Sequence, residues 1–167
     1  AQYALRRSER LDRAVLLAPA GTIAPINFAF IWRAIFTLIA PKTGMRIFFD
    51  WSAPTMASNS RWREERSHFI DDALLGMRAF VRRRLVPPLP LSDEQWSKIE
   101  TPTLVLFGDL EVIFDPQMAA AKLAKVAPQI RVEMIVGESH DFFVTAAEGI
   151  AKHVTAFLRT PRSISRI

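Results

Sequence analysis

The sequence contains no cysteine among its 167 residues. That absence excludes a disulfide scaffold, a zinc site with cysteine ligands and a cysteine nucleophile, and it leaves the redox compartment open. The sequence also lacks a large excess of charge of either sign. It has 22 Lys and Arg against 17 Asp and Glu, which gives a formal net charge of +5. Such an excess permits weak attraction to anionic surfaces without requiring a nucleic-acid partner, and we expect none.

The chain also lacks internal repeats and low-complexity tracts. Its 50% hydrophobic content excludes intrinsic disorder as the general state. Residues 2–10 have the pattern of a helix end with no N-cap before it, and no signal-peptide pattern is visible. These features indicate part of a longer protein, for which a cytoplasmic location is the default expectation.

Long uninterrupted hydrophobic runs are missing as well. The best candidate, Ile23 to Ala40, is close to the ~20 residues of a membrane-spanning helix. Pro25, Asn27 and Arg33 interrupt it, and a central arginine is costly in hydrocarbon. We therefore expect no transmembrane span and interpret the run as a lid-like helix over an apolar pocket. An alternative is that its aromatic residues Phe28, Trp32 and Phe36 contact a lipid surface.

What is present is an alternation of strands and helices. Three short runs, each closed by glycine or by proline and glycine, are predicted to be strands: Val15–Ala18, which is apolar and expected to be buried, the continuously apolar Thr103–Phe107, and Ile130–Val136. Between the last two runs, Asp115 and Pro116 begin a helix, and another helix is expected over about residues 143–158 with Ile150, Val154, Phe157 and Leu158 inward. This order predicts an α/β fold with a parallel sheet.

Residues 22–100 differ, because they are helical in period, rich in aromatics and broken by prolines. Ile70, Leu74, Met77 and Val81 share one helix face, and the helix is expected to end at the proline run 86–90. Ser92 then begins a capping box with Gln95. We expect the aromatic residues of this region to be mostly core or pocket lining: Phe28, Phe30, Trp32, Phe36, Phe48, Phe49 and Trp51.

Two strand ends carry reactive side chains. In open α/β sheets, sites form beyond the carboxyl ends of the strands. Glu111 and Asp109 follow one such end, and His140 follows another. A carboxylate that orients a histidine, with the histidine free to accept a proton from a nucleophile, is the base half of a hydrolytic triad. The chain order, acid before histidine, matches the Ser…Asp/Glu…His order of one fold class.

These segments resemble the carboxyl-terminal part of the α/β-hydrolase superfamily, in particular its carboxylesterase- and lipase-like serine hydrolases. The resemblance rests on Pro102-Thr103-Leu104 with its strand, on Gly108-Asp109-Leu110-Glu111, and on Gly137-Glu138-Ser139-His140. Residues 5–21 are similar to the helix after the nucleophile and the strand that follows it. The resemblance implies a partial core over residues 1–21 and 101–159, a helical cap over 22–100 and a basic tail over 160–167.

The same resemblance assigns His140 as the catalytic base and Glu111 as the acid, with Asp109 as the alternative acid. It implies no cofactor and a small, apolar ester as substrate. The family's Gly-x-Ser-x-Gly nucleophile motif is absent from these 167 residues. We therefore expect ester hydrolysis from the complete protein and none from this chain alone. Without upstream strands, the edge beside residues 15–18 would be open, and we expect the isolated chain to aggregate or to be loosely packed.

Other chemistries stay open. The same scaffold hosts epoxide hydrolases, dehalogenases, C–C hydrolases and acyltransferases, and a non-catalytic interaction module is a further alternative. We interpret Asp115 as a helix cap, and Ser139 is not expected to be a nucleophile. No two histidines have metal-ligand spacing, so no metal site is predicted. His68 and His153 are expected to have no catalytic role, with His153 on the surface, and a solvated face is expected for the arginines Arg61, Arg63, Arg66, Arg82, Arg83 and Arg84.

Overall fold

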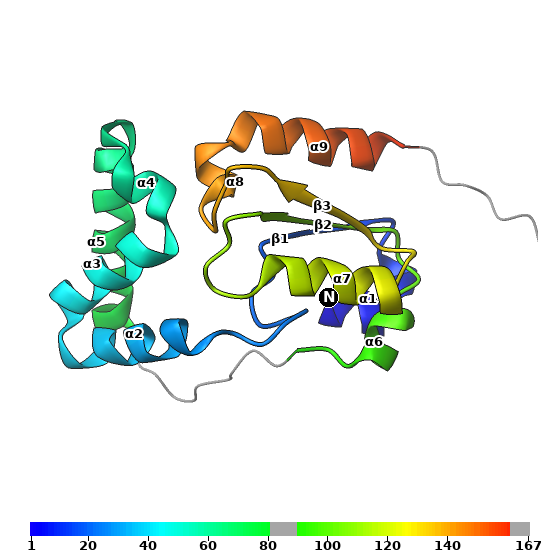
Figure 1. The fold of residues 1–167 in the computed structure, drawn as a ribbon, viewed down its shortest axis with the longest axis horizontal. Helices are drawn as coiled ribbons and strands as arrows, with labels where there is room; N and C mark the ends of the chain where they lie inside the picture. The colour runs from blue at the N-terminus through cyan, green and yellow to red at the C-terminus, as the bar shows by residue number, and fades with distance from the viewer. Residues whose placement is uncertain (81–89, 161–167) are drawn as a thin grey trace, which may run out of the picture.

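The computed structural model describes residues 1–80 and 90–160 of the chain. Its centre is a sheet of three parallel strands in the order β1 (Ala14–Leu17), β2 (Thr103–Gly108) and β3 (Arg131–Ile135). In the register, Val105 pairs with Leu16 of β1 and with Val132 of β3. The predicted α/β fold with a parallel sheet is confirmed (Figure 1).

Helices cover both faces of the sheet, and the alternation of side chains along β2 explains why. Val105 and Phe107 pack in one apolar cluster with α7 (Pro116–Val126) and with Trp96 of α6 (Asp93–Ser97). Leu104 and Leu106 point the other way and pack with α9 (Ala147–Arg159). A strand buried on both faces needs apolar residues at every position. Figure 1 shows α7 and α9 on opposite sides of the sheet.

The first strand differs from its prediction. β1 lies at the edge of the described sheet, in agreement with the open edge expected beside residues 15–18, but it is half-buried with Leu17 exposed, whereas the apolar run predicted a buried strand. It also ends at Leu17, because Ala18 leaves the extended conformation with a φ of 41°. An apolar run by itself does not say whether a strand has a neighbour on both sides.

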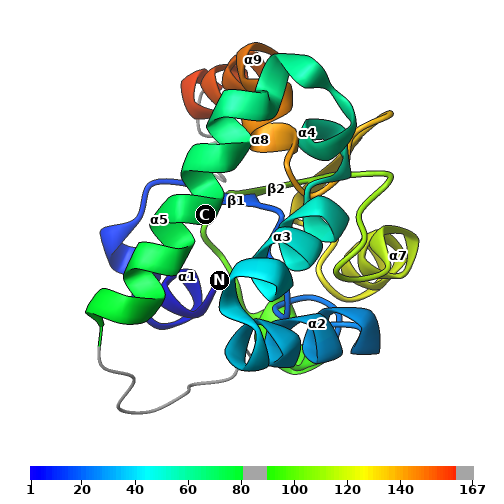
Figure 2. The same ribbon diagram turned by 90° about the vertical axis from the view of Figure 1, so that its left-hand side faces the viewer.

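A group of helices stands apart from the sheet. These are α2 (Phe28–Ile39), α3 (Pro41–Ser52), α4 (Pro54–Ser58) and α5 (Arg63–Ala79), with a 3-10 turn, η2 (Ser60–Trp62), before α5. They lie between β1 and β2 in the sequence, and we call α2–α5 the helical insertion. Figures 1 and 2 show the insertion beyond the carboxyl ends of the strands.

The apolar run Ile23–Ala40 is divided by Asn27, whose side chain accepts a hydrogen bond from the Phe30 amide at 2.9 Å and caps α2. Arg33 places its guanidinium 4.3 Å from the ring centre of Trp32 and 4.6 Å from that of Trp51. Within residues 1–80 and 90–160, no helix is long and apolar enough to cross a membrane.

Some packing predictions are wrong. Phe28 was expected in the core or a pocket, and it is largely exposed at the first turn of α2. Leu158 was expected inward, and it is half exposed at the end of α9. Both residues lie at the end of a helix. At a helix end, the spacing of apolar residues says least about whether a side chain meets a neighbouring element.

Helix boundaries also differ from those predicted. Residues 2–10 form two short pieces, α1 (Gln2–Arg6) and the 3-10 helix η1 (Ser8–Arg10). The last predicted helix is divided into α8 (Phe142–Thr145) and α9. α5 ends at Ala79, while Val81 and residues 86–89 of the proline run expected to end it lie outside the described residues.

The predicted helix caps are confirmed. The carboxylate of Asp115 accepts a hydrogen bond from the Met118 amide at 2.8 Å, at the start of α7. Ser92 and Gln95 exchange reciprocal hydrogen bonds of 2.9 and 3.2 Å and complete the capping box of α6. Caps are local devices, so their signature is readable from a few consecutive residues.

Candidate active site

Two loops meet at the carboxyl ends of β2 and β3. The contact depends on Gly108, because a Cβ atom there would lie 2.0 Å from the carbonyl oxygen of Glu138. The Leu110 amide donates to that same oxygen at 2.9 Å. Gly137 makes the turn after β3 with a φ of 77°, a conformation that side chains disfavour. The two glycines thus let the loop after β2 and the loop after β3 touch.

Asp109, the alternative acid of the sequence prediction, joins these two loops. Its Oδ1 accepts a hydrogen bond from the Gly137 amide at 2.7 Å. Its own amide donates to the carbonyl of Ile135 at 3.1 Å. This side chain stabilises the turn after β3, and its carboxylate bonds to the Gly137 amide rather than to His140.

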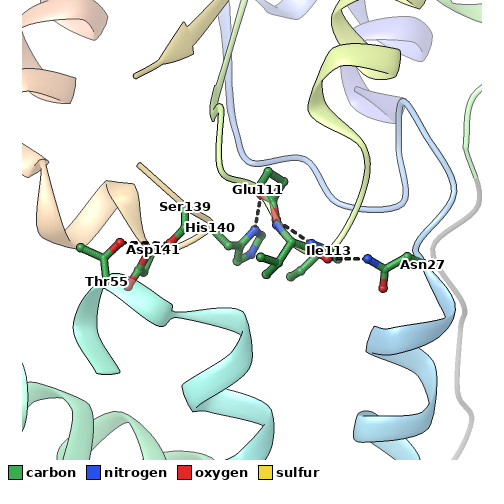
Figure 3. Close-up of polar contacts among 8 residues, drawn as sticks. Asn27, Thr55, Glu111, Ile113, Ser139, His140 and Asp141 are labelled. Carbon is green, nitrogen blue, oxygen red and sulfur yellow. Dashed lines mark hydrogen bonds and ion pairs between the residues drawn. The ribbon is translucent and has the colours of Figure 1, made fainter. Parts of the chain in front are cut away.

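Glu111 is the carboxylate that reaches His140. Its Oε2 lies 2.7 Å from Nδ1 of His140 (Figure 3). Its Oε1 accepts hydrogen bonds from the amides of Val112 and Ile113, both at 2.8 Å. The side chain is fully buried. A buried carboxylate is costly unless donors surround it, and here three donors bind its two oxygens.

The contact defines the state of the imidazole. An ionised carboxylate only accepts hydrogen bonds, so Nδ1 of His140 must carry the proton that Glu111 accepts. In the neutral ring, Nε2 then has a free lone pair. Among the described residues, no group hydrogen-bonds to that nitrogen. The arrangement can take up a proton at Nε2 and stabilise the resulting imidazolium.

His140 opens onto an apolar cavity of about 280 Å³ between the helical insertion and the loops that end the strands. Such a volume is near the lower end of the range for small-molecule sites. All four helices of the insertion or the turns between them contribute to the wall, and the loop after β3 contributes His140 and Asp141. The lining residues are Phe30, Phe48, Phe49, Ser52, Ala53, Met56, Phe69, Ile113, His140, Asp141, Phe143 and Val144.

A larger cavity, of about 380 Å³, lies within the helical insertion between α2, α3 and α5. Its walls are apolar and include Met45 and Met77. None of its lining residues is titratable or nucleophilic except for the hydroxyl of Thr37, which donates to the carbonyl of Ala34 at 2.6 Å. Size alone therefore does not identify the reactive site, and the cavity beside His140 is the candidate.

The remaining sequence candidates lie elsewhere or have structural contacts. His68 is exposed on α5, 3.7 Å from Glu64. His153, on α9, contacts Glu133 on the outer strand. Ser139 is buried and donates its hydroxyl proton to Asp141, so it is not displayed as a nucleophile.

The arginine prediction is partly wrong. Arg66 does not belong to a solvated face, because it forms an ion pair with Asp50 of α3 and is largely buried. Arg61 lies over the Trp62 ring, 5.0 Å from its centre. The arginines at positions 82–84 fall outside the described residues.

Sequence reasoning missed three residues at the site. Asn27 was read only as an interruption of an apolar run, and it binds the loop of Glu111 through the carbonyl of Val112. Asp141 and Thr55 were not singled out, and they join the loop of His140 to α4. For Asn27, its position before an apolar helix was the available signal. For Asp141, no local signal exists, because its partner is 85 residues away.

No protein-family model matches the chain. Two curated proteins of Bacillus subtilis (strain 168) are similar to nearly all of it. The uncharacterized carboxylesterase nap is 26% identical over 170 residues, which cover 98% of this chain and 54% of that protein. The carboxylesterase YbfK is 25% identical over 169 residues, which cover 93% of this chain and 52% of that protein. The chain thus spans about half the length of these relatives.

Solved structures are likewise similar to nearly all of this chain and to little more than half of their own. A naproxen esterase (carboxylesterase NP) from Bacillus subtilis superposes with a TM-score of 0.79 at 25% identity, over 94% of this chain and 54% of that one. A meta-cleavage product hydrolase from Pseudomonas fluorescens superposes with a TM-score of 0.66 at 20% identity, over 94% of this chain and 59% of that one. The fold is that of α/β-hydrolases, and the predicted fold class is confirmed.

Proposed function

We propose that this chain supplies the acid, the base and part of the substrate cavity of a carboxylesterase. The observation that carries the proposal is the 2.7 Å contact between His140 and the fully buried Glu111, at the wall of an apolar cavity. The names of the two curated relatives, both carboxylesterases, support the same reaction class.

In the proposed reaction, Nε2 of His140 accepts the proton of an attacking hydroxyl and later donates it to the leaving alcohol. Glu111 holds the ring in the tautomer with the proton on Nδ1 and stabilises the imidazolium. The amides of Val112 and Ile113 stop the carboxylate from turning away, since they bind its other oxygen at 2.8 Å. A general base of this kind contributes typically ~10²–10⁴-fold to the rate.

The nucleophile would come from a part of the protein outside these residues, because no Gly-x-Ser-x-Gly motif occurs in them. A serine at that place would give ester hydrolysis. An aspartate would give the chemistry of dehalogenases and epoxide hydrolases instead, with the same histidine. The identity of that one residue thus separates the proposed reaction from its alternatives on this fold.

For the substrate, we propose a small ester with an apolar acyl or alkoxy group. The cavity beside His140 offers aromatic rings from three helices of the insertion and from α8, which follows the His140 loop: Phe30, Phe48, Phe49, Phe69 and Phe143. Apolar walls with a few polar groups at one end favour a ligand that is apolar except at its reacting bond. The insertion, within the predicted boundaries 22–100, then acts as a cap.

The test uses the protein encoded by the complete open reading frame that contains these residues. We expect it to hydrolyse p-nitrophenyl esters, with kcat/KM rising from acetate to butyrate or longer acyl groups. His140→Ala should lower kcat/KM by ~10³-fold or more. The matched control is His153→Ala, which also removes a histidine bonded to a glutamate and should stay within about twofold, since surface substitutions are mostly neutral.

Two outcomes contradict the proposal. Equal losses in His140→Ala and His153→Ala would show that neither histidine has a special role. Turnover of a chlorinated alkane or an epoxide, without ester turnover, would favour an alternative chemistry. The 167-residue chain, assayed in parallel, is expected to be inactive because it has no nucleophile motif.

A further inference from the structure

Two buried polar side chains flank His140, and the proposed reaction does not use them. Ser139 and Asp141 are among the few buried polar residues of the described chain. Burial of a carboxylate without nearby donors is unfavourable, so the donors that Asp141 finds are informative. One of them is the Met56 amide on α4, in the helical insertion, and the other is the hydroxyl of Ser139 on the same loop.

The contacts form a directed chain of hydrogen bonds (Figure 3). Oδ2 of Asp141 accepts from the Met56 amide at 2.8 Å. Its Oδ1 accepts the hydroxyl proton of Ser139. The hydroxyl oxygen of Thr55 lies 3.2 Å from that of Ser139. Because the single proton of Ser139 goes to the carboxylate, Thr55 must be the donor in this last contact.

The start of α4 has no cap of its own. Its N-cap residue is Ala53, which has no side-chain acceptor, and Pro54 follows at the first helical position. The amide of Met56, at the third helical position, is the group that an N-cap side chain normally binds. Asp141 takes that role from the loop of His140. The start of α4 and the loop of His140 therefore stabilise each other.

A similar contact joins the insertion to the loop of Glu111. The side-chain amide of Asn27 donates to the carbonyl of Val112, and the backbone amide of Asn27 donates to the carbonyl of Ile113 at 2.9 Å. Both loops that carry the His140–Glu111 pair are thus hydrogen-bonded to the insertion. The apolar cavity lies between these two attachments.

We propose that Asp141 is a positioning residue that couples the docking of the helical insertion to the placement of His140. Without its carboxylate, the start of α4 separates from the His140 loop and the cavity wall at Met56 loosens. The consequence for turnover rests on the proposed esterase function, whereas the coupling itself does not.

The decisive measurement is hydrogen exchange of peptides covering residues 53–62, followed by mass spectrometry in the protein from the complete reading frame. Asp141→Ala should speed exchange there at least tenfold. Asp141→Asn should stay within about threefold of the wild type, because its amide oxygen can accept from Met56 and its amide nitrogen can donate to Ser139. The matched control is Ser92→Ala, which removes the cap of α6, another five-residue helix, and should leave residues 53–62 unchanged.

Kinetics supply a second readout. Asp141→Ala should raise KM at least tenfold for an ester whose acyl group fills the cavity, and much less for p-nitrophenyl acetate. Asp141→Asn should restore most of that loss. A general loss of stability would instead affect both esters alike and would not be rescued by asparagine.

Unchanged exchange at residues 53–62 in Asp141→Ala, or an equal increase in Ser92→Ala, would overturn the proposal even if esters are hydrolysed. Faster exchange confined to residues 53–62 would support the coupling even in a protein that hydrolyses no ester. Should Asp141→Ala not fold, Thr55→Val removes the hydroxyl that donates to Ser139. It should speed exchange beyond the roughly threefold range expected of Asp141→Asn, and no change there would also overturn the proposal.

Discussion

The described chain contains two histidine–glutamate contacts with nearly the same local geometry. Nδ1 of His140 lies 2.7 Å from Oε2 of Glu111, and Nδ1 of His153 lies 2.5 Å from Oε2 of Glu133. Their surroundings differ. The side chains of Glu111 and His140 are 0% and 23% exposed, whereas those of Glu133 and His153 are 18% and 47% exposed.

The two pairs also differ in what the second carboxylate oxygen of each glutamate binds. In Glu111 it binds two backbone amides, which are fixed by the loop. In Glu133 it binds the guanidinium of Arg131 at 2.5 Å, on a side chain that is mostly in solvent. His140 also opens onto a cavity, and His153 lines none of the cavities described above. A histidine–carboxylate contact therefore indicates a site only when burial, rigid support and space for a ligand accompany it.

The largest expected difference between the two pairs is in turnover. Glu111→Gln should lower kcat/KM for a p-nitrophenyl ester by ~10²–10⁴-fold. Glutamine can present its amide to His140, which favours the tautomer with the proton on Nε2 and removes the lone pair that accepts a proton. Glu133→Gln should stay within about twofold. Similar losses in both variants would remove the distinction that we draw.

A second difference should appear in the free energy of unfolding. Glu111→Ala leaves the amides of Val112 and Ile113 without an acceptor, at a cost of about 1–3 kcal/mol for each group left unpaired. Glu133→Ala removes only partly exposed contacts, which are worth about 0–1 kcal/mol. Urea denaturation of the two variants measures both values. A larger loss in Glu133→Ala would show that burial is not what distinguishes the pairs.

The smallest effect concerns salt. At 1 M ionic strength the screening length falls to about 3 Å, and contacts between exposed charges weaken. The ring resonances of His153 should therefore shift on raising sodium chloride from 0.05 to ~1 M. Those of His140 should hardly move, because its partner is out of solvent. Spectra of His153→Gln assign the signals, and equal salt shifts for the two histidines would contradict the comparison.

Much of the fold could be predicted from the sequence, and the misses have physical causes. The apolar run around Leu104 and the run around Val132 each end at a glycine, so their strands were readable. The cap at Asp115 was readable because its partner is three residues away. The exposure of Phe28 was not readable, because it depends on which neighbours a segment meets in space.

For the candidate site, sequence alone left Glu111 and Asp109 as rival acids. Both residues follow the end of β2 within three positions, and a short loop there could direct either carboxylate toward the histidine. The structure brings Glu111 to His140 and engages Asp109 with the Gly137 amide. The catalytic roles of Glu111 and His140 stay predictions until the variants are measured.

The amino-acid sequence by itself determined the alternation of strands and helices, the local caps and the placement of an acid and a histidine after successive strands. These features depend on periodicity and on residues a few positions apart. Only the tertiary structure decided which carboxylate meets the histidine, which of two histidine–glutamate pairs is buried beside a cavity, and that Asp141 caps α4 from 85 residues away. Such contacts join distant segments, and their energy depends on burial, which no local pattern of residues records.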